Sequence, residues 1–252
     1  MQEACLQTFT GLDGRPQDEL KVFTDKFKEW GVSLVGIGDV STALVPEFRH
    51  LPRAVSLAVH HPVVEPHSAP ESGKAVLEGK EIYSHQLNTV DTSIESIQKR
   101  AVAWLQSKGW RAFRIPPDSN RKDPRFVARL YPLFPHKTAA TCAGLGWVGK
   151  SGLLITPQFG PRASWGTILT DAPLKVAENP FVEGRCGKCR RCVETCPAGA
   201  IPDSEWVMGT ATQSHIDREA CGRHIEENSR KYGVWACGLC LSVCPQGRRV
   251  HG

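Results

Sequence analysis

The spacing of apolar residues predicts helices and short strands that alternate over the first two thirds of the chain. Apolar side chains recur at helical spacing from Asp18 to Trp30 and from Thr89 to Lys108, so both segments are predicted to be amphipathic helices. Short apolar runs predict strands at residues 33–38, 54–59, 110–115, 153–156 and 165–169. Residues 62–80 are rich in Pro, Glu, Ser and Gly and are predicted to form a surface loop. This alternation is typical of an α/β layer architecture.

The character of the sequence changes near residue 180, where cysteines and short turns replace the apolar periodicity. Only Cys5 and Cys142 lie before this point, and both are expected to be thiols without a special role. We therefore predict an α/β domain at residues 1–179 and a cysteine-rich domain at residues 180–252. Disulfides are typical of small secreted domains, but the first residues have neither the basic nor the apolar region of an export signal. Metal-bound thiolates in a cytoplasmic protein are expected instead.

The cysteines of the second domain have the spacing of bacterial ferredoxins. Residues 186–197 read Cys-Gly-Lys-Cys-Arg-Arg-Cys-Val-Glu-Thr-Cys-Pro, and residues 237–245 repeat the pattern without its first cysteine. Two-residue gaps let three thiolates bind one [4Fe–4S] cluster, while the cysteine before proline reaches the other cluster. Cys221 replaces the missing cysteine. The predicted ligands are Cys186, Cys189, Cys192 and Cys244 for one cluster, and Cys196, Cys221, Cys237 and Cys240 for the other.

A pair of structural zinc sites is the alternative, because Cys-x2-Cys pairs often bind zinc. Zinc does not account for a third cysteine at the same spacing, nor for the proline that follows the last cysteine of both runs. We therefore predict a ferredoxin-like domain with two [4Fe–4S] clusters.

Composition and charge exclude several classes of function. The chain is 40% hydrophobic and 23% charged, which is ordinary for a globular protein. Its formal net charge is +5, but two clusters of roughly −2 each bring the loaded protein close to neutral. Charge therefore gives no support for nucleic-acid binding. No apolar run approaches the roughly 20 residues that a membrane helix needs, so no membrane partner is expected.

A glycine-rich segment at residues 144–151, Gly-Leu-Gly-Trp-Val-Gly-Lys-Ser, matches the P-loop pattern of nucleotide-binding proteins. A P-loop requires a strand before its glycines and a helix after them. Here the Ala-rich residues 137–143 are predicted as helix and residues 153–156 as strand. Because this order is reversed, nucleotide binding is not favoured.

The glycine-rich segment and its surroundings closely resemble epoxyqueuosine reductases and, more distantly, corrinoid-dependent reductive dehalogenases. The resemblance rests on His136-Lys137, Ala143–Ser151, Leu153–Pro157, Gly160–Arg162 and Ile168–Asp171, all upstream of the double-cluster pattern. It implies a nitroreductase-like α/β domain that holds cobalamin and a ferredoxin domain that supplies it with electrons. The candidate cobalamin contacts are Gly144, Leu145, Gly146, Trp147, Gly149, Lys150 and Ser151. The alternative is a tight helix-to-strand turn that needs the same glycines to reverse direction.

A proton donor near the cobalt would complete a reductive cleavage. Epoxyqueuosine reductases carry an acidic donor about a dozen residues before the Gly-Leu-Gly segment, but residues 129–137 contain no carboxylate. The candidate donors are therefore Tyr131, His136 and Lys137, and the alternative is a surface His-Lys pair with a core tyrosine. The resemblance makes tRNA a candidate partner, and the missing carboxylate argues against the tRNA-modifying reaction.

Three functions follow from these residues. The first is a corrinoid-dependent iron–sulfur reductase that receives electrons from a ferredoxin, a flavodoxin or a reductase. The second is a two-cluster electron-transfer protein that delivers electrons to a partner corrinoid or flavin protein and has no substrate of its own. The third, an ATP-driven redox activator, depends on the P-loop pattern.

Overall fold

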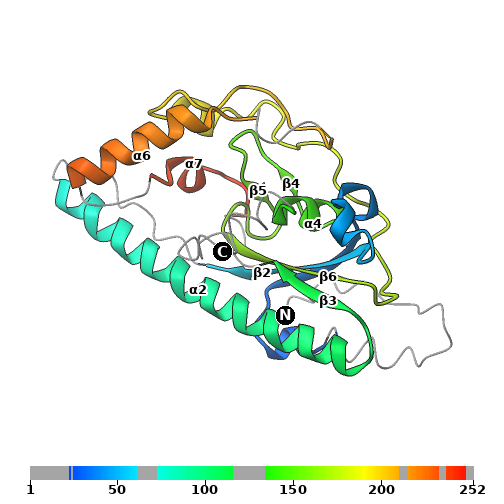
Figure 1. The fold of residues 1–252 in the computed structure, drawn as a ribbon. Helices are drawn as coiled ribbons and strands as arrows, with labels where there is room; N and C mark the ends of the chain where they lie inside the picture. The colour runs from blue at the N-terminus through cyan, green and yellow to red at the C-terminus, as the bar shows by residue number, and fades with distance from the viewer. Residues whose placement is uncertain are drawn as a thin grey trace. The chain divides into compact units, whose positions relative to one another are not determined.

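The structure is a computed structural model that describes residue 23 and residues 25–61, 73–115, 134–209, 215–232 and 237–247. Helices and strands alternate in the N-terminal part of the chain, while three strands and then three helices follow one another in the C-terminal part (Figure 1). The strands are β1 (Leu34–Asp39), β2 (Arg53–His60), β3 (Ala112–Ile115), β4 (Trp147–Val148), β5 (Leu154–Ile155) and β6 (Ala163–Thr170). The helices are η1 (Ser41–Ala43), η2 (Pro46–Phe48), α2 (Gly73–Ser107), α4 (His136–Cys142), α5 (Arg191–Thr195), α6 (Arg218–Tyr232) and α7 (Leu239–Ser242).

The chain forms two compact units that are interleaved along the sequence. The first unit comprises Met1–His60, Thr89–Leu145 and Ala163–Phe181, and the second comprises His61–Asn88, Gly146–Arg162 and Val182–Gly252. The first unit contains a four-stranded sheet, and the second contains the β4–β5 hairpin and the cysteine-rich segment. The boundary predicted between residues 179 and 180 stays a prediction.

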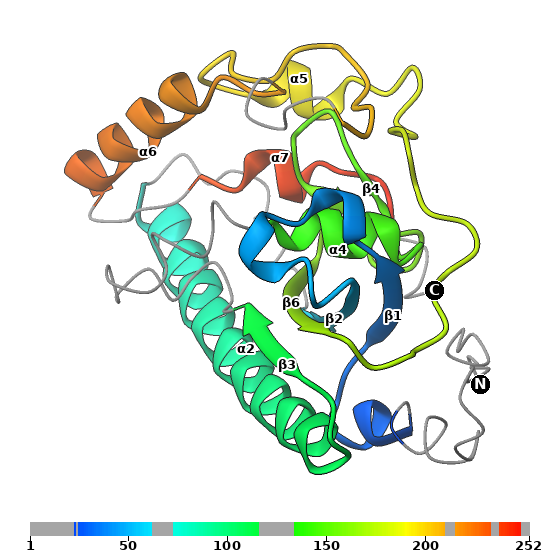
Figure 2. The same ribbon diagram turned by 45° about the vertical axis from the view of Figure 1, so that its right-hand side comes forward.

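The sheet of the first unit has the strand order β1-β2-β6-β3, and each neighbouring pair is antiparallel (Figure 2). The central pair is β2 and β6, which are in register from Arg53 opposite Thr170 to His60 opposite Ala163. The interior of β2 is buried at five successive positions, as expected for a strand that is covered on both faces. The apolar runs predicted as strands are therefore strands, in a mixed α/β fold. The nitroreductase-like character of this unit stays a prediction.

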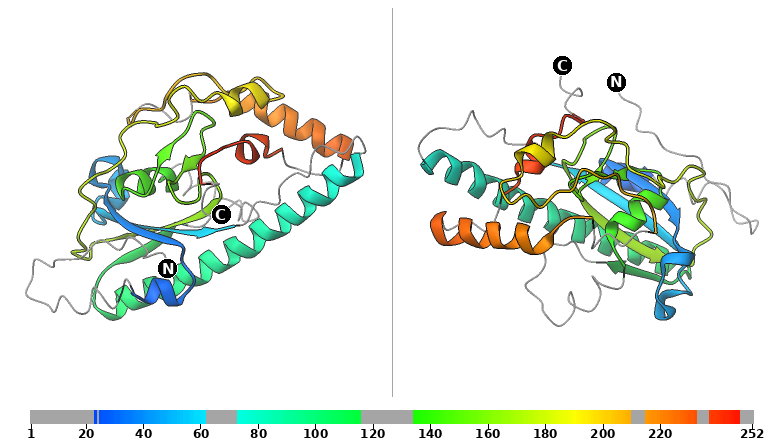
Figure 3. Two further views of the ribbon diagram at one scale, coloured as in Figure 1. Left: turned by 180° about the vertical axis from the view of Figure 1, so that it is seen from behind. Right: turned by 90° about the horizontal axis from the view of Figure 1, so that it is seen from above.

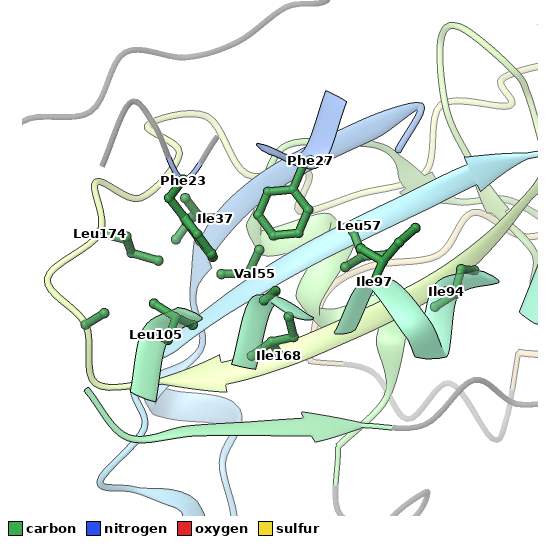
Figure 4. Close-up of a cluster of buried hydrophobic side chains, with 12 residues drawn as sticks. Phe23, Phe27, Ile37, Val55, Leu57, Ile94, Ile97, Leu105, Ile168 and Leu174 are labelled. Carbon is green, nitrogen blue, oxygen red and sulfur yellow. The ribbon is translucent and has the colours of Figure 1, made fainter. Parts of the chain in front are cut away.

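One face of the sheet is covered by the second half of α2, which runs along the strands (Figure 3). Ile94, Ile97 and Leu105 of α2 are at most 1% exposed and pack on side chains of β2 and β6 (Figure 4). Phe23 and Phe27 complete this core, and residues 25–29 are helical as predicted. The predicted helix over residues 89–108 is confirmed by this packing.

Two expectations for the N-terminal part of the chain need correction or restriction. The surface loop predicted over residues 62–80 is wrong from Gly73 onward, because α2 begins there. Gly73 and Gly79 suggested a loop, but Lys, Ala, Leu and Glu around them favour a helix. Residues 62–72, and residues 18–22 of the predicted first helix, lie outside the described residues.

The other face of the sheet is covered by α4. A Cβ atom on Gly38 of β1 would lie 2.7 Å from the Cβ of Cys142, so glycine allows α4 to approach the strand closely. Cys142 fills this contact, and burial raises the pKa of its thiol, in line with a packing role. Cys5 lies outside the described residues. Within the described part of the chain, no helix combines the length and the hydropathy needed to cross a bilayer.

Candidate functional site

Two short helices of the second unit each carry one cysteine and lead to a Cys-Pro pair. α5 contains Cys192 and is followed by Cys196, while α7 contains Cys240 and is followed shortly by Cys244. The backbone N–H groups of Cys196 and Cys244 each donate to the carbonyl three residues earlier, at 3.4 Å. Proline comes next in both runs and cannot continue a helix, so the two runs end in the same way. The eight thiols are all half-buried.

Electrostatic interactions divide the thiols into two groups, and the pKa is raised for Cys186, Cys192, Cys221, Cys240 and Cys244. Burial is the larger cause of each rise, and neighbouring thiolates add to it. The first group is Cys186, Cys189, Cys192 and Cys244, and the second is Cys196, Cys221, Cys237 and Cys240. Burial and these neighbours raise the pKa of Cys240 to about 12, and Cys192 is its neighbour from the other group. The two groups therefore adjoin.

Each group has the ligand number of a [4Fe–4S] cluster, which takes four thiolates. The first group joins three cysteines of the first run to Cys244, the Cys-Pro cysteine of the second run. The second group joins Cys221, Cys237 and Cys240 to Cys196, the Cys-Pro cysteine of the first run, as a crossed arrangement requires. A zinc ion would instead gather four sulfurs at about 2.3 Å from one atom. The donor set fits two clusters, and its assignment residue by residue remains a proposal.

The glycine-rich segment lies in the helix–turn–strand context that the sequence predicts. α4 precedes it, and β4 and β5 form an antiparallel hairpin. Lys150, in the turn of this hairpin, is only 5% exposed, and its Nζ donates to Gly187 O at 2.8 Å and to Asp203 Oδ1 at 2.7 Å. The hydrogen bond to Asp203 raises the pKa of Lys150, and the same bond lowers the pKa of Asp203. Lys150 is therefore engaged within the protein and is not arranged to bind phosphate.

Packing within the second unit accounts for two of the glycines in the hairpin segment. A Cβ atom on Gly146 would overlap the carbonyl oxygen of Ile155, and one on Gly149 would overlap the Ile155 side chain. Trp147 and Ser151 are buried at 5% and 7% exposure. Gly144 and Leu145, which belong to the first unit, are half-buried. Packing against Ile155 therefore gives Gly146 and Gly149 a structural reason, as the tight-turn alternative expects.

The candidate proton donors have different surroundings. His136 begins α4 and is 6% exposed, and its Nδ1 lies 2.8 Å from Thr167 Oγ1 of β6. It is therefore not the surface histidine of the alternative interpretation. Lys137, next to it, is half-buried, and Tyr131 lies outside the described residues. Ser56 stands opposite Thr167 in the sheet, and its buried hydroxyl has no hydrogen-bond partner among the described residues. His136 thus belongs to a buried polar patch on the α4 face of the sheet.

Two residues beside the cysteines were not found by sequence reasoning. Arg162 is 6% exposed and donates from Nη2 to Cys244 O at 2.8 Å and from Nη1 to Gln246 O at 2.6 Å. Asp203 pairs with Lys150 at 2.7 Å and with Arg190 at 3.2 Å. Arg162 was named only as part of a segment that carries the family resemblance, and Asp203 belongs to no recognised motif. Both act across more than 50 residues of sequence, which local patterns do not predict.

Comparison with known proteins agrees with this reading of the cysteines. Residues 185–247 match the model of the 4Fe-4S double cluster binding domain. The chain is 37% identical to epoxyqueuosine reductase of Aliivibrio fischeri over 111 residues, and these residues make up 43% of this chain and 29% of that protein. It is also 37% identical to epoxyqueuosine reductase of Escherichia coli over 108 residues, and these residues make up 42% of this chain and 28% of that protein. The chain thus matches less than a third of the length of these relatives.

Solved structures share the fold over most of the chain. Epoxyqueuosine reductase with an epoxyqueuosine-modified tRNA-Tyr stem loop has a TM-score of 0.56 at 17% identity, covering 92% of this chain and 66% of that chain. A reductive dehalogenase whose structure suggests a mechanism for B12-dependent dehalogenation has a TM-score of 0.62 at 20% identity, and the match covers 96% of this chain and 34% of that chain. At these identities the likeness concerns the fold alone. The chain resembles epoxyqueuosine reductases, and two iron–sulfur clusters are supported by its double-cluster domain.

Proposed function

We propose that this chain is an iron–sulfur oxidoreductase whose two [4Fe–4S] clusters pass single electrons to an acceptor. The observation that carries the proposal is the grouping of eight half-buried thiols into two adjoining sets of four. Clusters of this type transfer one electron at a time, and adjoining clusters give the electron a second site within the same unit. An external ferredoxin, flavodoxin or reductase is the proposed donor.

The proposed acceptor is a corrinoid, as the resemblance to epoxyqueuosine reductases and dehalogenases implies. A corrinoid supplies a strongly reducing cobalt centre, which the protein has to position and shield. The proposed donors of a proton are Tyr131, His136 and Lys137, and the proposed corrinoid contacts are Gly144, Leu145, Gly146, Trp147, Gly149, Lys150 and Ser151. Support for the donor role of His136 comes from its hydrogen bond to Thr167, which fixes the ring. A structural neighbour was solved with an epoxyqueuosine-modified tRNA stem loop, so tRNA stays a candidate partner, although residues 129–137 lack the acidic donor.

A second candidate is an electron-transfer protein that serves a partner corrinoid or flavin protein. The packing of the glycine-rich hairpin favours this second candidate. Lys150 already donates a hydrogen bond to Asp203, and a side chain on Gly146 or Gly149 would overlap Ile155. On this hypothesis the chain binds no substrate of its own. Both candidates share the two clusters and differ in whether the chain itself binds a corrinoid.

Addition of hydroxocobalamin to the anaerobic protein separates the two candidates. For the reductase we expect a shifted visible spectrum before reduction, co-elution of the corrinoid on gel filtration, and cobalt reduction once the clusters are reduced photochemically. For the electron carrier we expect no spectral shift and no co-elution, with cobalt reduced only by collision. The same chain stripped of iron is the control, because it should reduce no cobalt in either case. Failure of the cluster-loaded chain to reduce cobalt at all would contradict the proposed function.

A further inference from the structure

One continuous segment of the second unit, Gly146–Arg162, contacts both cysteine runs. The turn of its β4–β5 hairpin lies against Cys186, the first cysteine of the first run. Its last residue, Arg162, bonds to the carbonyl of Cys244, the last cysteine of the second run. A crossed arrangement combines these two cysteines in one cluster, so the segment joins the two parts of the chain that the first group brings together.

The turn of the hairpin packs against the residues around Cys186. Gly149 lies close to this cysteine, because a Cβ atom on Gly149 would be 3.4 Å from Cys186 Sγ. Lys150 Nζ donates to the carbonyl of Gly187 at 2.8 Å. The Gly187 N–H donates in turn to Glu205 Oε1 at 2.6 Å. The residue after Cys186 is therefore held at both its carbonyl and its N–H group, which fixes the start of the first run.

The C-terminal end of the segment holds the backbone around Cys244. Arg162 is 6% exposed, and its guanidinium donates to Cys244 O at 2.8 Å and to Gln246 O at 2.6 Å. These carbonyls flank Pro245, which has no N–H group with which to fix the chain itself. A Cβ atom on Gly160 would overlap the Gln246 carbonyl, so the two backbones are in close contact. The loop that carries Cys244 is therefore held by both a side chain and the backbone of the segment.

Cys244 depends on this contact because it lies beyond the helix of its run. α7 ends at Ser242, and the Cys244 N–H makes only a long hydrogen bond to Leu241 O, at 3.4 Å. Cys240, by contrast, lies within α7, where the Ser242 N–H donates to Gly238 O at 3.0 Å. A guanidinium presents its donors in a rigid fork and makes charge-assisted hydrogen bonds, so it can fix the loop where the helix has ended.

We propose that Arg162 is a positioning residue for the cluster of the first group, and that it aligns Cys244 with the turn at Cys186. The inference rests on the proposed function, since it requires both clusters and crossed ligands. Removal of Arg162 loosens Cys244 and the iron that Cys244 would hold, while the cluster of the second group keeps its four ligands. The glycine-rich hairpin acquires a role that requires neither a nucleotide nor a corrinoid, namely to pack beside Cys186.

The test removes the guanidinium and follows the iron that Cys244 would bind. On oxidation by ferricyanide, a cluster in the [4Fe–4S]²⁺ state loses one Fe²⁺ ion and gives one electron to the oxidant. The [3Fe–4S]⁺ cluster that remains is detected by electron paramagnetic resonance. Loss of a residue that holds a metal ligand lowers metal affinity about 10–100-fold, so after brief oxidation we expect the [3Fe–4S]⁺ signal of Arg162→Met to be about tenfold larger than that of the unmodified chain.

Three further variants identify the cluster that changes. Cys244→Ser and Cys196→Ser mark the two clusters, because each replaces the Cys-Pro cysteine of one run. The spectrum of Arg162→Met should match that of Cys244→Ser. Arg191→Met is the matched control for charge, since it removes an exposed cation next to Cys192 and should leave the signal unchanged.

A spectrum that matches Cys196→Ser, an equal signal in Arg191→Met, or loss of iron and sulfide from both clusters together would overturn the inference. If Arg162→Met does not assemble its clusters, Arg162→Lys gives the same test, because lysine keeps the buried charge but lacks the planar fork of donors. The same signal should then appear, and its absence would contradict the positioning role. Iron and sulfide analysis of the unmodified chain distinguishes failure of this inference from failure of the proposed function, since the latter would appear as missing clusters.

Discussion

Replacement of Gly146 by alanine tests whether packing explains the glycine-rich hairpin. The new methyl group would overlap the carbonyl oxygen of Ile155 and lie 2.9 Å from its carbonyl carbon. Both are backbone atoms, so the contact cannot be relieved by a side-chain rotation. Forcing an extra methyl group into a packed region costs about 1–3 kcal/mol, and the lower entropy of the unfolded alanine chain returns about 0.4–1 kcal/mol. We therefore expect a net loss of about 1–2 kcal/mol in the free energy of unfolding.

The assay is urea unfolding of the anaerobic, cluster-loaded protein, followed by circular dichroism. Gly222→Ala is the matched control, because Gly222 lies inside α6 and a Cβ atom there meets nothing within 4 Å. Alanine in a helix interior is favoured over glycine by about 1 kcal/mol, so the control should be slightly more stable than the unmodified chain. A Gly146→Ala variant as stable as the unmodified chain would refute the packing argument. Stability that falls only when a corrinoid is present would instead favour a ring contact.

Two further predictions follow from the geometry of the second unit. Calorimetry with ATP and magnesium should give no heat of binding, because Lys150 is engaged by Asp203 and its turn is not a phosphate cradle. Micromolar binding that is lost in Lys150→Ala would contradict this. If the ligands are crossed, Cys196→Ser should damage the same paramagnetic signal as Cys240→Ser. Damage that instead matches Cys189→Ser would mean that each run serves its own cluster.

The parts of the structure that depend on local spacing could be predicted from the sequence. The apolar run at 54–59 became β2, and the Ala-rich segment before the glycines became α4. The cysteine grouping is also local for the most part, because two-residue gaps alone bring three thiolates to one cluster. The start of α2 was missed because Gly73 and Gly79 obscured a segment that otherwise favours a helix.

Contacts between distant residues could not be predicted in this way. Arg162 and Cys244 are 82 residues apart in sequence, and Lys150 and Asp203 are 53 apart. No periodicity or motif links such pairs, since their approach depends on how the hairpin packs on the cysteine-rich segment within the second unit. The P-loop pattern drew attention to Lys150, and the reversed order of helix and strand argued against a phosphate partner, but only the structure identifies Asp203 as the residue that Lys150 contacts.

The claim that two [4Fe–4S] clusters occupy the eight cysteines is tested most directly by chemical analysis of the protein prepared without oxygen. Iron and acid-labile sulfide are measured per chain, together with zinc, on the same sample. The crossed arrangement predicts about eight iron and about eight sulfide per chain, with zinc in trace amounts. Zinc as the dominant metal, or iron without an equal amount of sulfide, would contradict the account.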